Sequence, residues 1–472
     1  MEGRKPYIYE ALISFGFLIM VMGVGIAVYG ADPHIPMLIG TAFSALMSLK
    51  IGFKWKAIEK SMFDGIRQAL QAIVILAIIG VLIGVWLLSG VVPSMIYYGL
   101  QILTPKVFLV ATVLICPITS LATGTAWGTA GTIGIALMGI AHGLGVPAPI
   151  AAGAIISGSY FGDKMSPLSD TTNLAPAMAG TDVFTHVKFM IKPTIVSYGI
   201  TLGIFAMVGM QFNSANVDFS AIEAMRSGLE SAFNISPILL IPPVVVIVSI
   251  AKKMPAIPGI FLGIVLGAIL APLMQGANLG DILNAGYGGY ISETGVESID
   301  SLLSSGGLKN MMYSISLTII AMMFGGIMEK TGQLEVIVER LLRGVKTAQG
   351  LVALTIATCL GSNMTMPEQY ISIVVPGRMY AKAYADKGLH PKTLSNALES
   401  SGTLTSPLVP WNTCGAFLYG VLGVPTALYA KWAVFNYITP LVVIALSFVG
   451  VTVAYLKDEK TSQGEDEAVE SM

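Results

Sequence analysis

Residues 159–173 read SYFGDKMSPLSDTTN, and this polar run lies inside a strongly apolar part of the chain. It holds Asp163, Lys164 and Asp170 together with five serines or threonines, whereas the flanking segments, VPAPIAAGAIISG and LAPAMAG, are almost purely apolar. Charged groups are costly inside a membrane, and where they occur they usually mark an ion or substrate pathway. We therefore expect the functional site here, held in place by the rest of the chain.

The composition is that of a membrane protein. Of the 472 residues, 54% are hydrophobic and only 11% are charged, and the mean hydropathy is +0.76. Soluble domains carry roughly 25% charged residues, so an all-α protein that crosses the membrane several times is predicted. The net charge of −1 excludes a basic surface for nucleic acid. The three cysteines lie in apolar segments and form neither a disulfide framework nor a zinc-binding set.

Short motifs recur in the same order in the two halves of the chain. PHIP at 33–36 is followed by PAIP at 255–258, and SPL at 166–168 is followed by SPL at 406–408. Repetition in a fixed order predicts an internal duplication. The predicted division is a first repeat at 1–212, a linker at 213–234, a second repeat at 235–456 and a disordered cytoplasmic tail at 457–472.

The basic residues predict that the two repeats have opposite orientations, because Lys and Arg concentrate in cytoplasmic loops. In the first half five of them lie at 50–67, after the second apolar segment, whereas in the second half Lys252 and Lys253 follow the first apolar segment. Inversion requires an odd number of spans per repeat. We predict about five spans plus one re-entrant hairpin in each repeat, helices broken at the midplane, and both termini in the cytoplasm. This is the architecture of secondary transporters.

The hairpin tips and the broken helices are the expected pocket, because unwound backbone is tolerated in a membrane only where it is shielded from lipid. Freed carbonyls and side-chain oxygens bind Na⁺ at such breaks. Asp170, Thr171, Thr172 and Asn173 supply oxygens in one short run, and Na⁺ is expected at Asp170 and Asn173. The other pocket candidates are Ser120, Thr123, Thr125 and Ser166 in the first half and Ser362, Asn363, Thr365, Ser406, Asn412 and Thr413 in the second. The alternative is that these small residues only pack helices closely.

An acid that holds either a proton or a sodium ion is needed to couple the two. The candidates within the membrane are Asp163, Asp170, Glu368 and Glu399. Asp170 has no adjacent cation and is the first choice, and Glu368 on the second hairpin is the next. Asp163 lies beside Lys164, so a structural ion pair is an equal alternative for it.

The stretch 158–193, with its core GDKMSPLSDTTNLAP, strongly resembles the NhaC family of bacterial sodium/proton antiporters. Length and layout resemble that family as well. The resemblance implies a place in the ion transporter superfamily, whose divalent-anion members have two inverted repeats, two re-entrant hairpins and an elevator-like transport domain. By analogy with such relatives, a homodimer is expected. The motif implies sodium and proton handling at Asp163, Asp170, Thr171, Thr172 and Asn173.

The function implied by the resemblance is Na⁺/H⁺ antiport across the cytoplasmic membrane, with the lipid bilayer as surroundings and no cofactor besides the transported ions. The family also includes antiporters that exchange malate and protons for lactate and sodium, so lactate or malate is the alternative cargo. Lys164 and Arg378 are the cations available for an organic acid. An intramembrane hydrolase would need a second catalytic acid motif, and a channel would not need duplicated broken helices. We therefore expect a transporter and not an enzyme.

Overall fold

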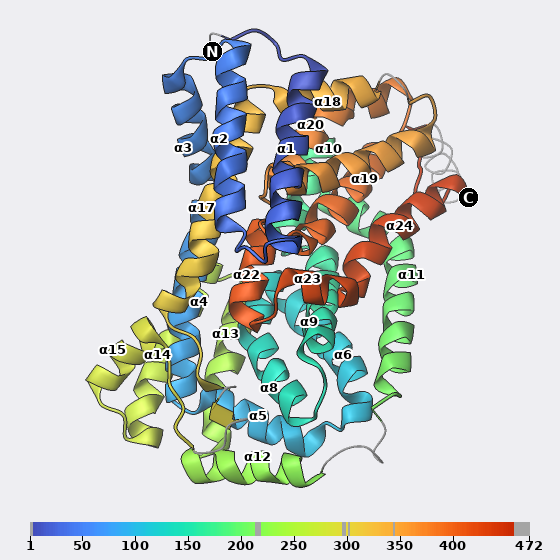
Figure 1. Ribbon diagram of the computed structural model, residues 1–472. Coiled ribbons are helices and arrows are strands. Elements are labelled where there is room, and N and C mark those ends of the chain that lie inside the picture. The colour runs from blue at the N-terminus through green and yellow to red at the C-terminus, as the bar shows by residue number, and fades with distance from the viewer. Residues whose placement is uncertain (1–2, 213–218, 295–298, 301–302, 343–344, 457–472) are drawn as a thin grey trace, which may run out of the picture.

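The computed structural model is almost entirely helical (Figure 1). Among the described residues, seven helices are long and apolar enough to cross a membrane, or up to nine if each of two bent pairs counts as one span. The predicted all-α polytopic class is therefore confirmed. The structure describes residues 3–212, 219–294, 299–300, 303–342 and 345–456.

The first half of the chain contains eleven named α-helices, and a π-helical turn at Ala130–Gly134 joins α7 to α8. These helices are α1 (Ile8–Ala27), α2 (His34–Ile51), α3 (Trp55–Gln68), α4 (Leu70–Leu88), α5 (Val91–Ile102), α6 (Pro105–Thr123), α7 (Ala126–Thr129), α8 (Ile135–Gly143), α9 (Ala148–Met165), α10 (Asp170–Ala179) and α11 (Val183–Gly209).

The second half begins within the predicted linker, where α12 occupies Phe219–Ala232. Residues 213–218 of that linker and the predicted tail at 457–472 lie outside the described residues. A second π-helical turn, Glu399–Thr403, extends α21. The other helices are α13 (Ile241–Ala251), α14 (Ala256–Gln275), α15 (Leu279–Gly288), α17 (Leu308–Lys330), α18 (Gln333–Leu342), α19 (Ala348–Thr365), α20 (Ile371–Asp386), α21 (Pro391–Leu398), α22 (Thr413–Leu422), α23 (Thr426–Tyr429) and α24 (Val434–Phe448).

The two halves of the chain interlock through α4 and α17. Helix α17 packs against α2 and α3 of the first half, and α4 packs against α14 and α15 of the second (Figure 1). The short broken helices are also shared, because α10 contacts α20 and α21 of the second half, while α22 contacts α4 and the π-helical turn at Ala130–Gly134 of the first half. The site is therefore built from both halves at once.

The chain breaks after α9 because of a proline. Pro167 has no N–H and disfavours helical backbone in the residue before it. Ser166 accordingly is extended, with φ −84° and ψ 120°, and α9 ends at Met165. Ser169 then starts α10 as its N-cap, its hydroxyl accepting from the Thr172 backbone N–H at 3.4 Å. In the second half, Asn412 caps α22 in the same way by accepting from the Cys414 N–H at 3.0 Å.

Two glycines let α9 approach α6 closely and so fix the position of Asp163. A Cβ on Gly162 would lie 2.6 Å from the Pro117 carbonyl oxygen, and a Cβ on Gly158 would lie 2.8 Å from the Cys116 Cβ. Small residues at such contacts are typical of helix packing in membranes. Gly162 immediately precedes Asp163, so any displacement of α9 here moves the acidic side chain.

Substitution of Gly162 tests this packing. Gly162→Ala is expected to destabilise the protein by about 1–3 kcal/mol, because the added methyl group forces α9 away from α6. The measurement is the thermal unfolding midpoint in detergent. Gly203→Ala in α11 is the matched control, since a Cβ there meets nothing within 4 Å. Equal midpoints for the two variants would contradict the close contact.

Candidate functional site

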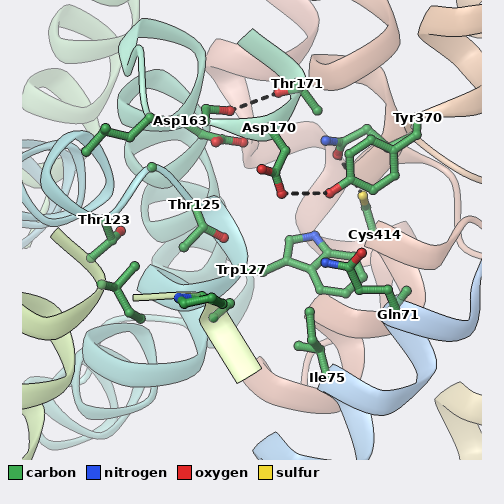
Figure 2. Close-up of a pocket in the computed structure, with 18 of the residues that line it drawn as sticks. Gln71, Ile75, Thr123, Thr125, Trp127, Asp163, Asp170, Thr171, Tyr370 and Cys414 are labelled. Atoms are coloured by element: carbon green, nitrogen blue, oxygen red, sulfur yellow. Dashed lines mark hydrogen bonds between the residues drawn. The ribbon is translucent and has the colours of Figure 1, made fainter. Parts of the chain in front are cut away.

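A cavity of about 410 Å³ lies where the breaks of both halves meet. Figure 2 shows residues of the first hairpin tip (123–127) and of the break between α9 and α10 on one side, with Tyr370 and Cys414 from the second half opposite them. Gln71 and Ile75 of α4 and the turn between α13 and α14 complete the lining. The cavity lining therefore includes residues from 123–127 of the first half and from 368–370 of the second.

Two buried carboxylates reach this cavity. Asp163, near the end of α9, interacts with the Ser169 hydroxyl and with the Ala126 backbone N–H at the start of α7. Glu368, at the second hairpin tip, accepts from the Tyr370 backbone N–H at 3.4 Å through Oε1. Its Oε2 atom is buried and has no hydrogen-bond partner among the described residues. A buried acid with a free oxygen is available to a cation or a proton.

Asp170 is the third acid and the one most open to the cavity. It is exposed, occupies the first turn of α10, and accepts from the Tyr370 hydroxyl at 3.4 Å (Figure 2). This hydrogen bond joins the break of the first half to the hairpin tip of the second. Binding of an ion to Asp170 would therefore affect a contact between the two halves of the chain.

The charges of the lining are unequal. Three carboxylates, of Asp163, Asp170 and Glu368, face a single lysine, Lys253. Lys253 lies in the turn after α13 with φ +70°, a left-handed conformation that is uncommon for a residue other than glycine. An acidic cavity in a membrane protein favours cations over anions.

The structure brings six of the sequence-predicted site residues to the cavity wall: Thr123, Thr125, Asp163, Asp170, Thr171 and Glu368. The others lie outside the lining. In the first half they donate to backbone carbonyls: Ser120 to Ser159 O (2.7 Å), Ser166 to Leu121 O (2.9 Å), Thr172 to Asp163 O and Lys164 O (3.1 Å each), and Asn173 to Pro167 O (2.8 Å) and Ser169 O (2.7 Å).

In the second half most of the corresponding residues also bind one another or the backbone. The Asn412 amide donates to Asn363 O and Oδ1 at 3.2 and 3.1 Å, and the Asn363 amide donates to Gly402 O at 2.8 Å. Thr365 donates to Gly361 O at 2.8 Å. Ser406 donates to Thr403 O at 2.7 Å, Thr413 interacts with Glu368, and Ser362 is buried with no partner for its hydroxyl among the described residues.

The polar residues of the wall that sequence reasoning did not name as site residues include Gln71, Ser169, Lys253, Gln369 and Tyr370. Gln369 Oε1 lies 2.9 Å from Cys414 Sγ and 3.1 Å from Ser406 Oγ, so it ties the hairpin tip to α22. Gln369 and Tyr370 directly follow Glu368, and that adjacency was the available signal. Arg378, offered as a cation for an organic acid, is exposed on α20 and does not line the cavity.

Comparison with known proteins gives one family. A family model described as the "Na+/H+ antiporter family" matches residues 158–451. The chain is 38% identical to the "Na(+)/H(+) antiporter NhaC" of Alkalihalophilus pseudofirmus, over 94% of this chain and 97% of that protein. It is 37% identical to the "Malate-2H(+)/Na(+)-lactate antiporter" of Bacillus subtilis (96% and 97%). It is 35% identical to the "Arginine/ornithine antiporter ArcD" of Halobacterium salinarum (98% and 96%).

The relatives match nearly the whole chain. The residues matched by the family model include both breaks, the π-helical turn at Glu399–Thr403 and the acidic residues Asp163, Asp170 and Glu368. The relatives are transporters, so the expectation that the chain is not an enzyme is confirmed. The chain belongs to the Na⁺/H⁺ antiporter family.

Proposed function

We propose that this protein exchanges Na⁺ for H⁺ and that the acidic cavity binds both ions in turn. The observation that carries the proposal is the charge imbalance of the lining, with three carboxylates and one lysine. Uncompensated buried charge costs several kcal/mol per ion. The cavity therefore favours a state in which either a metal cation or protons neutralise the acids. Because both bind the same carboxylates, Na⁺ and H⁺ compete for the site.

The proposed ligands are oxygens from both halves of the chain. Asp163, Asp170 and Thr171 come from the first break, and Glu368 comes from the second hairpin tip. Thr123 and Thr125 add hydroxyls from the first tip. The Asn173 amide is committed to two carbonyls, so its proposed part in sodium binding is to hold the break in shape.

The choice of cargo follows from the same charges. An organic anion such as malate or lactate would meet three carboxylates and would find only Lys253 among the lining residues to pair with. The names of two relatives include organic substrates, malate and lactate in one case and arginine and ornithine in the other. We therefore place Na⁺/H⁺ exchange first and malate/lactate exchange second, and labelled counterflow in proteoliposomes separates them.

The proposed architecture is two inverted repeats of about five spans, each with one re-entrant hairpin. Reciprocal packing supports it: α17 packs on α2 and α3, and α4 packs on α14 and α15. The order of elements supports it too, because each half has a helix that ends just before a serine–proline pair and then a short capped helix, α9 and α10 in the first half and α21 with its π-helical continuation and α22 in the second. We propose both termini in the cytoplasm, a cavity that faces the cytoplasm through the turn with Lys252 and Lys253, and a homodimer in the cytoplasmic membrane.

Neutralising the acids tests the proposed exchange. Asp163→Asn and Asp170→Asn are each expected to reduce sodium-dependent proton movement in vesicles to the level of vesicles without the protein, because the amide can neither release a proton nor balance Na⁺. Asp182→Asn is the matched control. Its carboxylate caps α11 outside the cavity, accepting from Phe184 N and Thr185 N at 3.0 and 2.9 Å, and Asn caps equally well. Full exchange by both cavity variants would exclude these acids.

The reactivity of Cys414 tests whether sodium enters this cavity. All three cysteines are buried, but Cys414 lines the cavity and Cys116 and Cys359 do not. In variants that keep one cysteine each, a small cationic methanethiosulfonate is expected to label Cys414 and not Cys116. Sodium should slow the labelling, since the bound ion repels the reagent and blocks its path. Labelling at the same rate with sodium or choline would contradict sodium binding at this place.

A further inference from the structure

A second cluster of polar side chains lies behind the first break and outside the cavity lining. It is formed where α9, α10 and α11 pack against α21 and the π-helical turn that follows it. Each member is at most 2% exposed. The cluster consists of Lys164, Thr171, His186, Ser395, Asn396, Glu399 and Ser400. Of these, only Thr171 also lines the cavity.

Lys164 is held by neutral partners. Its Nζ donates to Ser400 Oγ at 2.8 Å and lies 3.0 Å from Met190 Sδ, and Ser400 donates in turn to Asn396 Oδ1 at 3.1 Å. Lys164 interacts electrostatically with Glu399. In the described part of the chain, however, the two side chains form no direct ion pair. The lysine thus offers a counter-charge without binding the carboxylate directly.

Glu399 is connected to the cavity by hydroxyl groups. Its Oε1 accepts from Thr171 Oγ1 at 3.2 Å, and Thr171 Oγ1 lies 3.1 Å from Ser169 Oγ. Ser169 and Thr171 both line the cavity. The Glu399 Oε2 atom is buried with no hydrogen-bond partner among the described residues. The Thr403 hydroxyl of the same π-helical turn also interacts with this carboxyl group. Two hydroxyls, of Thr171 and Ser169, therefore bridge the cavity to the Glu399 carboxyl group.

The neighbouring charged groups are few. On the cavity side, Asp163 interacts electrostatically with Glu399 and also with Asp170. On the opposite side, His186 of α11 faces Lys164 and Asp182, and its Nδ1 lies 2.8 Å from Ser395 Oγ. An ionised carboxylate that is buried, lacks a direct ion pair and has a free oxygen is costly. Binding of a proton to Glu399 removes this cost, because the carboxyl group is then uncharged.

We propose that Glu399 is a second proton-exchanging group, which carries one proton per cycle in addition to the proton exchanged in the cavity. This inference rests on the proposed Na⁺/H⁺ exchange. When Glu399 releases its proton, its O–H bond breaks and the proton passes to Thr171 Oγ1, while the Thr171 proton passes to Ser169 Oγ and the Ser169 proton passes to water in the cavity. Both hydroxyls end as they began. Lys164 then balances the carboxylate.

The competing explanation is a purely structural role, in which Lys164 and Glu399 only hold α9 against α21. A structural role affects how fast the protein transports or how stable it is, whereas a proton carrier sets how many protons are exchanged for each sodium. The number of exchanged protons is a thermodynamic quantity and does not depend on how much active protein is present.

The experiment measures the balance point of exchange in proteoliposomes with the membrane potential clamped at zero. A tenfold sodium gradient is balanced by about 0.5 pH unit when two protons exchange for one sodium, and by about 1 pH unit when one proton does. Glu399→Gln is expected to lower the number of protons per sodium by one. Thr171→Val, which removes one hydroxyl of the relay, should slow exchange and leave the balance point unchanged.

Two controls keep the result decisive. Glu10→Gln replaces another buried glutamate, one that pairs with Arg4 at the start of α1, and should leave the balance point unchanged. If Glu399→Gln does not fold, Lys164→Met combined with Glu399→Gln removes both charges together, and it should show the same shift. An unchanged balance point in the variant that folds would overturn the role of Glu399. Absence of any sodium-dependent balance point in the unmodified protein would instead overturn the proposed exchange.

Discussion

Backbone groups freed where helices stop inside the membrane need new hydrogen-bond partners, and this requirement shapes the whole site. At the first break Asn173 and Thr172 donate to carbonyls on both sides of Pro167. At the second break Asn363 and Asn412 bind each other and the Gly402 carbonyl. The side chains that hold the breaks in this way are committed to these hydrogen bonds, which is why we propose the neighbouring acids as the ion-binding groups.

The sequence predicts the breaks well because their cause is local. Pro167 acts on the residue before it, and the polar run around it is conspicuous in an apolar chain. The same reasoning identified Asp163, Asp170 and Glu368, all of which line the cavity. Charged residues are rare in the membrane-spanning part, so each one stands out. Helix positions were predictable for a similar reason, since apolar length alone identifies most spans.

The sequence did not predict which hydroxyl and amide side chains face the cavity. Thr171 and Thr172 are adjacent and chemically identical, yet Thr171 lines the cavity while Thr172 binds the carbonyls at the end of α9. The difference depends on how α10 is rotated against α20 and α21, which is a matter of tertiary packing. The cluster of Lys164 with Ser400 and Glu399 is of the same kind, because helices far apart in the chain bring it together.

Ion exchange between two sides of a membrane requires that a change of occupant alters contacts in both halves of the protein. The hydrogen bond between Tyr370 and Asp170 meets this requirement directly, since its two ends belong to different halves. Thr171 provides a second such connection, because its hydroxyl donates to Glu399 of the other half and lies within hydrogen-bond distance of Ser169 in its own break. Adjacent residues of one short helix thus contact the second half at separate points. The first turn of α10 is therefore where ion binding, as proposed here, would act on the contacts between the two halves.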